Sequence, residues 1–148
     1  MPRTALIVPV RGLDAYYDGD PVGPAHVTVL FPFLDGGSVD EGAVADVLAS
    51  FAAFPFTLAS RERFDDGVRW LRPQPSEPFL RLTQAVWRRW PEHPPYEGAH
   101  DEVIPHLTIT RDDAPVPVAA RADEVWLIEE RPAGWVLRRS FPLAQGVA

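Results

Sequence analysis

Two short segments of the chain alternate polar and apolar residues in the same order. Residues 26–29 (His-Val-Thr-Val) and 106–109 (His-Leu-Thr-Ile) both read His, apolar, Thr, apolar, and each follows closely after a proline. In a β-strand, residues i and i+2 point to the same face. Each segment therefore predicts a strand that presents an imidazole and a hydroxyl on one face and buries two aliphatic side chains on the other.

Similar reasoning predicts the other elements. Apolar runs and period-two alternation predict strands over residues 4–10, 25–33, 56–64, 68–71, 104–110, 124–129 and 135–143. Helical spacing predicts helices over residues 39–53, behind a capping box formed by Ser38 and Glu41, and over residues 77–90, behind Ser76. Residues 115–122 are expected to form a short turn of helix. Turn residues at 65–67 and 132–134 predict two hairpins.

The order of these elements predicts a mixed α+β domain with an internal duplication, because each half contains one motif strand. A chain of 148 residues with 46% apolar content is long enough to build one core, so residues 1–148 are expected to form a single domain. The glycine-rich phosphate loop and long βα alternation of Rossmann and P-loop proteins are absent from the sequence.

Composition narrows the setting in which the protein works. The sequence contains no cysteine, which excludes disulfides and thiolate metal sites and fits a cytoplasmic protein. It has no apolar run of membrane-spanning length and no signal-peptide pattern. We therefore expect a cytoplasmic monomer that does not engage a membrane.

The net charge of −7 bears on the kind of substrate. Proteins that grip long nucleic acids usually present a basic stripe, because they neutralise several phosphates at once. Here the arginines are scattered, whereas acidic residues cluster at positions 65–66, 112–113 and 129–130. This distribution favours a small nucleotide or a short RNA end over a long strand.

Two histidines and two threonines around one cleft suit the chemistry of a phosphodiester. The ordinary imidazole pKa of about 6.5 lets one histidine accept a proton while the other gives one near pH 7. The hydroxyls of Thr28 and Thr108 can donate hydrogen bonds to the phosphoryl oxygens. The scheme needs no metal or other cofactor, and it requires the imidazoles of His26 and His106 to lie roughly 5–8 Å apart.

With both motifs in view, the sequence resembles the 2H phosphoesterases, which include 2′-5′ RNA ligase-like proteins and cyclic nucleotide phosphodiesterases. Residues 26–33 (His-Val-Thr-Val-Leu-Phe-Pro-Phe) resemble the first motif of short bacterial members, and residues 94–98 with 104–108 resemble the approach to the second. The resemblance implies two lobes related by a pseudo-twofold axis, with largely antiparallel sheets that flank a central cleft.

The resemblance also implies an activity. It points to a metal-independent phosphodiesterase that acts on 2′,3′-cyclic phosphate or 2′-5′-linked nucleotides or short RNA ends, together with the reverse ligation for which some relatives are named. In this reading His26 and His106 are the catalytic residues and Thr28 and Thr108 bind the phosphate. The resemblance assigns His106 as the base and His26 as the acid.

Aromatic residues near the motifs are candidates for binding the nucleoside, because bases stack on exposed rings. Tyr96 and Phe33 are the two we select. Three further rings lie near the motifs and fit a core role equally well: Tyr16, Tyr17 and Trp70. Three arginines, which fit surface ion pairs as well as phosphate contacts, complete the set: Arg69, Arg72 and Arg111.

Alternative interpretations remain open on the sequence alone. The same His/Thr cleft would serve a non-catalytic nucleotide-binding module. A metallohydrolase would need histidine and carboxylate ligands, but His93 and His100 lack the spacing of a strong metal site, so no metal-binding residue is expected. Turnover separates the enzyme from the module, and a chelator separates it from the metallohydrolase.

Overall fold

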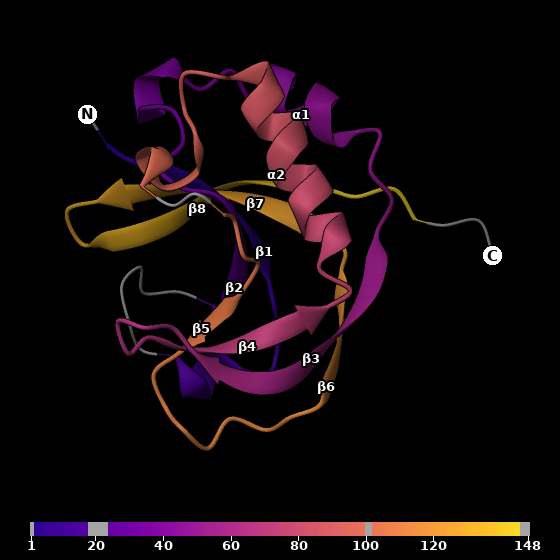
Figure 1. The fold of residues 1–148 in the computed structure, drawn as a ribbon. Coiled ribbons are helices and arrows are strands. Elements are labelled where there is room, and N and C mark those ends of the chain that lie inside the picture. The colour runs from indigo at the N-terminus through magenta and orange to yellow at the C-terminus, as the bar shows by residue number, and fades with distance from the viewer. Residues whose placement is uncertain (1, 18–23, 100–101, 146–148) are drawn as a thin grey trace.

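The computed structural model describes residues 2–17, 24–99 and 102–145. Within these ranges, eight strands form one curled sheet with two α-helices packed against it (Figure 1). The strands are β1 (Thr4–Pro9), β2 (His26–Leu30), β3 (Phe54–Arg63), β4 (Arg69–Gln74), β5 (Leu107–Ile109), β6 (Val118–Ala122), β7 (Glu124–Arg131) and β8 (Gly134–Pro142). The helices are α1 (Glu41–Leu48) and α2 (Glu77–Arg89), and a 3-10 turn, η3, spans Pro95–Gly98.

The motif strands β2 and β5 lie side by side at the centre of the sheet. The strand order is β6-β3-β4-β5-β2-β1-β7-β8, and every pair of neighbours is antiparallel. β2 and β5 pair at one position only, where Val27 stands opposite Leu107. The sheet therefore has two four-stranded halves that meet at the motif strands, in agreement with the predicted α+β class and its two lobes.

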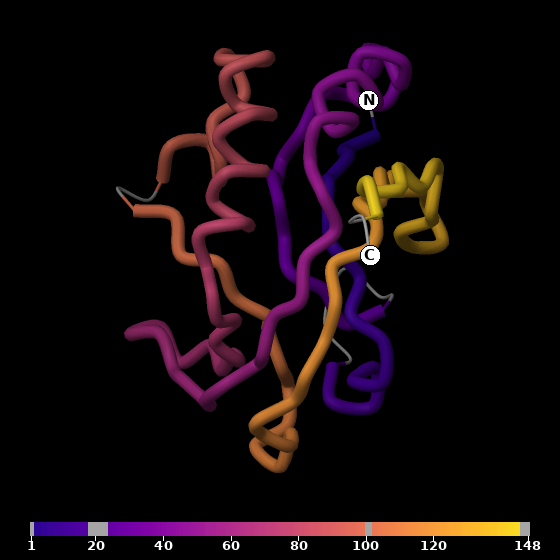
Figure 2. The backbone as a smooth tube through the Cα atoms, turned by 90° about the vertical axis from the view of Figure 1, so that its right-hand side faces the viewer, coloured from indigo at the N-terminus to yellow at the C-terminus, as the bar shows by residue number. Residues whose placement is uncertain are grey.

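Alternation along the strands separates a helix-covered face from an open face. On β2, Val27 and Val29 are 0% and 2% exposed and belong to the main core, as do Leu107 and Ile109 on β5. α2 packs its apolar residues against this face, and the Thr83 hydroxyl donates to the Val29 carbonyl at 2.7 Å. Seen from the side, α2 and the β7–β8 hairpin lie on opposite sides of β1 and β2 (Figure 2). The open face is thus left for His26 and Thr28.

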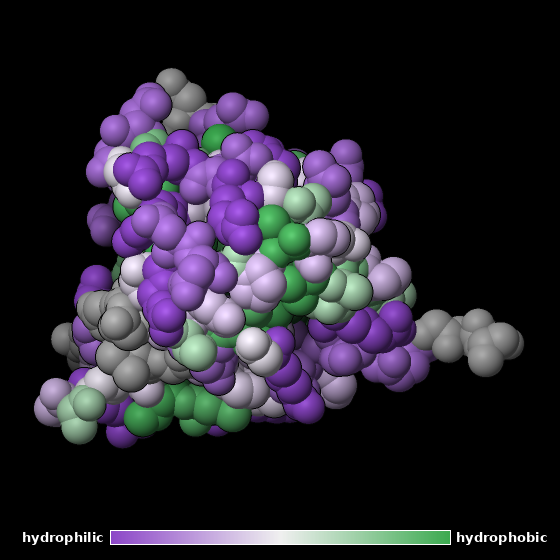
Figure 3. Space-filling view, turned by 90° about the horizontal axis from the view of Figure 1, so that it is seen from below, coloured by the Kyte–Doolittle hydropathy of each residue, from purple (hydrophilic) through white to green (hydrophobic). Residues whose placement is uncertain are grey.

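The surface seen from below is a mosaic of hydrophilic residues and small apolar patches (Figure 3). In the part of the chain that the structure describes, no helix combines the length and the apolar content needed to cross a membrane.

The helix boundaries differ from the prediction because the caps differ. α1 begins only at Glu41 and ends at Leu48, and its N-cap is Asp40, whose carboxylate accepts a hydrogen bond from the Ala43 amide at 3.1 Å. Ser38 instead ends a separate 3-10 turn, so the proposed capping box is wrong. Ser76 does hold the N-cap position of α2, but its side chain makes no capping hydrogen bond.

The short helix expected over residues 115–122 is also wrong. Residues Val118–Ala122 form β6, which pairs along its whole length with Phe54–Leu58 of β3. An alanine-rich segment has little intrinsic preference for a strand. The free edge of β3 offers backbone hydrogen bonds that outweigh this preference, and single-sequence patterns do not reveal such a long-range partner.

Candidate active site

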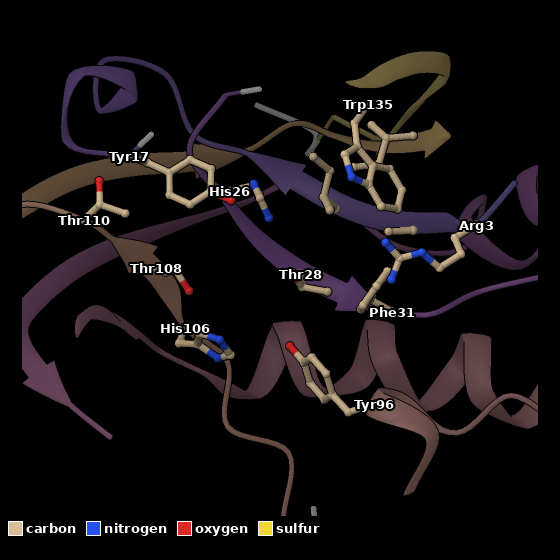
Figure 4. A pocket seen from close by; sticks show the side chains of 13 residues that line it. Arg3, Tyr17, His26, Thr28, Phe31, Tyr96, His106, Thr108, Thr110 and Trp135 are labelled. Carbon is tan, nitrogen blue, oxygen red and sulfur yellow. The ribbon is translucent and has the colours of Figure 1, made fainter. Parts of the chain in front are cut away.

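The four motif side chains line one cavity of about 370 Å³ on the open face of the sheet (Figure 4). Its apolar floor comes from the same face of neighbouring strands, with Ala5 and Ile7 on β1 and Ile128 on β7. The motifs, eighty residues apart in sequence, therefore face a common space. The arrangement predicted from the repeated pattern is present.

The register of β2 and β5 explains how the motif residues meet. Val27 stands opposite Leu107, and in an antiparallel pair one step forward along one strand corresponds to one step back along the other. His26 is therefore placed opposite Thr108, and His106 opposite Thr28. Side chains directly opposite have Cβ atoms about 4.5–5.5 Å apart, and diagonal neighbours lie at about 7–8 Å. The two histidines are such a diagonal pair, which suits the separation expected around one phosphate.

Both imidazoles are held by the same local hydrogen bond. His26 Nδ1 lies 3.0 Å from the Pro24 carbonyl oxygen, and His106 Nδ1 lies 2.7 Å from the Ile104 carbonyl oxygen. A carbonyl can only accept, so Nδ1 carries a proton in both rings. Nε2 is then the nitrogen that gains or loses a proton in each histidine. The residue two places before each histidine thus fixes its tautomer.

The surroundings of the two rings differ. Tyr17 packs edge-on against His26 with ring centroids 5.7 Å apart, and Phe64 packs edge-on against His106 at 5.1 Å. Burial lowers the pKa of His26 below 6.5, the Pro24 carbonyl partly opposes this by raising it, and the nearby His106 lowers it further. His26 is therefore biased toward the neutral form.

Tyr96 lies in the cleft, but it presents its hydroxyl to the other side chains (Figure 4). That hydroxyl is hydrogen-bonded to the Thr28 hydroxyl. Burial raises the pKa of Tyr96, and the hydrogen bond from Thr28 only partly offsets this, so the phenol stays protonated near neutral pH. Tyr96 therefore lines the cleft, and the stacking of its ring on a base, which the sequence suggested, stays a prediction.

Phe33, the other candidate for nucleoside binding, is a core residue. It is 4% exposed and packs edge-on against Trp90 of the helical layer, with ring centroids 5.1 Å apart. It does not line the cleft, so that prediction is wrong. Phe31, two residues earlier, lines the cleft instead. The residues after β2 do not alternate between polar and apolar, so the sequence does not indicate whether Phe31 or Phe33 faces the cleft.

Sequence reasoning missed the wall at one end of the cleft, formed by Arg3, Phe31 and Trp135 (Figure 4). Arg3 donates to both carboxylate oxygens of Glu130, at 2.9 and 2.6 Å. Its guanidinium lies 5.4 Å from the Phe31 ring centroid and 5.7 Å from that of Trp135. Only the alternation that continues into β1 and along β8 could have placed Arg3 and Trp135 on the cleft side, and it did not indicate their function.

Comparison with known proteins now identifies the family. The model of the 2′-5′ RNA ligase superfamily matches residues 2–139. The chain belongs to this superfamily. No curated protein matches the sequence significantly.

Solved structures show the same 2′-5′ RNA ligase-like fold. Escherichia coli LigT complexed with 3′-AMP aligns with a TM-score of 0.69 and 18% identity, over 98% of this chain and 100% of that one. TT0787 of Thermus thermophilus aligns with a TM-score of 0.67 and 17% identity, over 98% of this chain and 100% of that one. At such low identity, these structures support the fold and leave the activity to be argued from the site.

The other predicted residues take different positions around this superfamily fold. Tyr17 lines the cleft, whereas Trp70 is 3% exposed and packs edge-on against His106. The three candidate arginines lie outside the cleft in ion pairs: Arg69 with Asp112, Arg72 with Glu62, and Arg111 with Asp113. Arg111 also lies over the ring of Tyr16. For these arginines, the surface role is the one observed.

Among the described residues, no group of three or more His, Cys, Asp or Glu side chains could hold a metal ion. His93 lies between α2 and η3, outside the residues that line the cleft. His100, the other histidine considered for a metal, lies outside the described residues.

Proposed function

We propose that this member of the 2′-5′ RNA ligase superfamily is a metal-independent phosphodiesterase that opens 2′,3′-cyclic phosphates or cleaves 2′-5′-linked nucleotides or short RNA ends. The same site would also run the reverse ligation. One observation supports this most directly. Two His-x-Thr motifs pair antiparallel over one cavity, with Nδ1 of each histidine fixed by a carbonyl and Nε2 left for proton transfer.

The proposed hydrolysis uses one neutral and one protonated imidazole. The neutral ring takes a proton from water as the water oxygen bonds to phosphorus. The protonated ring gives its proton to the ribose oxygen as the P–O bond breaks. Thr108 and Thr28 donate to the phosphoryl oxygens, whose charge grows in the transition state.

The pKa of His26 suggests which ring has which role. Burial lowers this pKa and so biases His26 toward the neutral form, which is the form that a base needs before the reaction. We therefore propose His26 as the base and His106 as the acid, the reverse of the roles implied by the resemblance. In ligation, the two roles exchange.

We propose a small nucleotide or a short RNA end as the substrate. Most arginines near the surface already pair with carboxylates, as Arg3 does with Glu130 and Arg121 with Asp123, so they add little to a basic stripe. The net charge of −7 disfavours a long polyanion. LigT has been crystallised with 3′-AMP, ATP and NADP⁺, which are ligands of this size.

We further propose that the nucleobase lies along the wall of Phe31 and Trp135, in place of the contact first expected from Phe33. Aromatic rings stack on any base, which allows little sequence preference. We expect the protein to act in the cytoplasm, since a chain without cysteine suits a reducing compartment. We also expect it to act as a monomer.

A panel of 2′,3′-cyclic nucleotides and 2′-5′ dinucleotides, assayed with EDTA, tests the proposal. We expect turnover in EDTA and a loss of about 10²–10⁴-fold in His26→Ala and in His106→Ala. His93→Ala is the matched control, because this histidine lies outside the cleft. Nucleotide binding without turnover in the parent would support the binding module, and activity lost to EDTA and restored by zinc would support the metallohydrolase.

A further inference from the structure

The backbone around Tyr96 adopts a conformation that side chains disfavour. Tyr96 has φ 52° and ψ 34°, and Glu97 has φ 57° and ψ 25°, so two consecutive non-glycine residues are left-handed. Such conformations cost free energy and persist only where the surrounding structure holds them. They concentrate at sites where a side chain must point in one direction.

Contacts at both ends of the residue hold Tyr96 in place. Its amide donates to the carbonyl oxygen of Phe31 at 2.6 Å, which fixes η3 to the end of the first motif strand. Its hydroxyl meets the Thr28 hydroxyl in the cleft (Figure 4). Tyr96 precedes the second motif in sequence and is bonded to the first in space, so it spans the two halves of the site.

Tyr96 also stands where two cavities meet. It lines the catalytic cleft, and together with His106 and Thr108 it lines an adjoining cavity of about 580 Å³. A phosphoryl group between the two histidines would lie beside both Thr28 and the phenol. The phenol is protonated near neutral pH, because burial raises its pKa.

We infer that Tyr96 is a third hydroxyl donor to the phosphoryl group, alongside the two motif threonines. In the free protein its hydroxyl bonds to that of Thr28. An anionic phosphoryl oxygen is a stronger acceptor than a neutral hydroxyl. When substrate binds, the hydroxyl protons of both Thr28 and Tyr96 therefore turn toward the phosphate. The left-handed backbone holds the phenol ready for this exchange. The inference rests on the proposed phosphodiesterase function.

Tyr96→Phe tests the inference by removing one oxygen and keeping the ring. If the phenol donates mainly as charge develops, kcat falls by about 10- to 100-fold and KM changes little. Tyr16→Phe is the matched control, since that tyrosine lies outside the cleft against Arg111, and we expect its kinetics to equal those of the parent. Thermal unfolding of both variants checks that each folds.

A double-mutant cycle separates direct contact from a positioning effect on Thr28. If Tyr96 contacts the phosphate itself, Tyr96→Phe still lowers kcat by about 5-fold or more when introduced into Thr28→Val. If Tyr96 only orients the Thr28 hydroxyl, the second substitution has no further effect, and the inference is overturned. An unchanged kcat in the single Tyr96→Phe variant overturns it as well.

The parent enzyme distinguishes this failure from failure of the proposed function. No turnover of any cyclic or 2′-5′-linked substrate by the parent would reject the phosphodiesterase, and with it the role of Tyr96. Turnover by the parent with equal kcat in Tyr96→Phe would retain the phosphodiesterase and reject the third donor.

Discussion

Replacing Gly36 with alanine should destabilise the protein because the new methyl group meets a fixed carboxylate. A Cβ at Gly36 would lie 2.1 Å from Glu129 Oε1 and 3.3 Å from Pro2 Cγ. The backbone at Gly36 cannot easily move away from Glu129, because hydrogen bonds hold it on both sides. The Gly36 amide donates to the Pro2 carbonyl at 2.9 Å, and its own carbonyl accepts from Arg138 Nη1 at 2.6 Å.

The carboxylate of Glu129 also resists displacement. Glu129 is 5% exposed, accepts from Arg131 Nε at 2.8 Å and lies 3.7 Å from Arg138 Nη1. Overpacking costs about 1–3 kcal/mol, and weakening a buried ion pair adds to it. We expect a total of about 2–4 kcal/mol, which for a domain of this size lowers Tm by roughly 6–16 °C.

Thermal unfolding followed by circular dichroism measures this effect, with Gly42→Ala as the matched control. Gly42 lies in the first turn of α1, where its nearest obstacle is Asp40 Oδ1 at 3.3 Å, and alanine favours the helix. Its Tm should equal or exceed that of the parent. A Tm for Gly36→Ala within roughly 2 °C of the parent would refute the packing argument, since Glu129 could then move away at a cost below about 1 kcal/mol.

Four further outcomes are expected. The acid limb of the kcat/KM profile should lie below pH 6.5, because His26 must be neutral and burial lowers its pKa; a limb above this value contradicts the role of His26 as base. Since unfolded His26 takes up a proton near pH 6.5 and folded His26 only at lower pH, stability should also fall as pH drops through that window. Thr108→Val should lower kcat by about 5–150-fold and raise KM less, and an unchanged kcat would remove this hydroxyl from the chemistry. Thr83→Val should lower the free energy of unfolding, measured in urea, by about 1–3 kcal/mol, because it removes the hydroxyl that donates to the Val29 carbonyl at 2.7 Å. Equal stability would show that this carbonyl accepts a hydrogen bond from another donor.

The sequence was most informative where local geometry determines the outcome. Period-two alternation alone placed His26 and Thr28 on one face and Val27 on the other, because a pleated strand allows no other arrangement. The hairpin at 65–67 was likewise predictable, since Gly67 takes the left-handed φ of +92° that the turn requires. These features depend on a few neighbouring residues.

Features that depend on distant partners could not be predicted in this way. Whether Phe31 or Phe33 faces the cleft depends on how the chain leaves β2, where the strand has ended and its alternation no longer applies. Arg3 reaches the cleft wall because β1 pairs with β7, which brings Glu130 beside it. The bond between Tyr96 and Thr28 joins residues 68 positions apart in sequence and follows from the η3 conformation. No local pattern indicates such contacts.

The way the two halves of the sheet are connected determines when the site can form during protein synthesis. One half, from β3 to β6, is continuous in the chain, whereas the other joins β1 and β2 to the late strands β7 and β8. A nascent chain stalled after residue 122 would already contain both His-x-Thr motifs and both helices. It would lack β7, the neighbour to which β1 pairs from Thr4 to Ile7, and with it Ile128 in the floor of the cleft. Both motif histidines are therefore synthesised before the strand that completes the cavity around them.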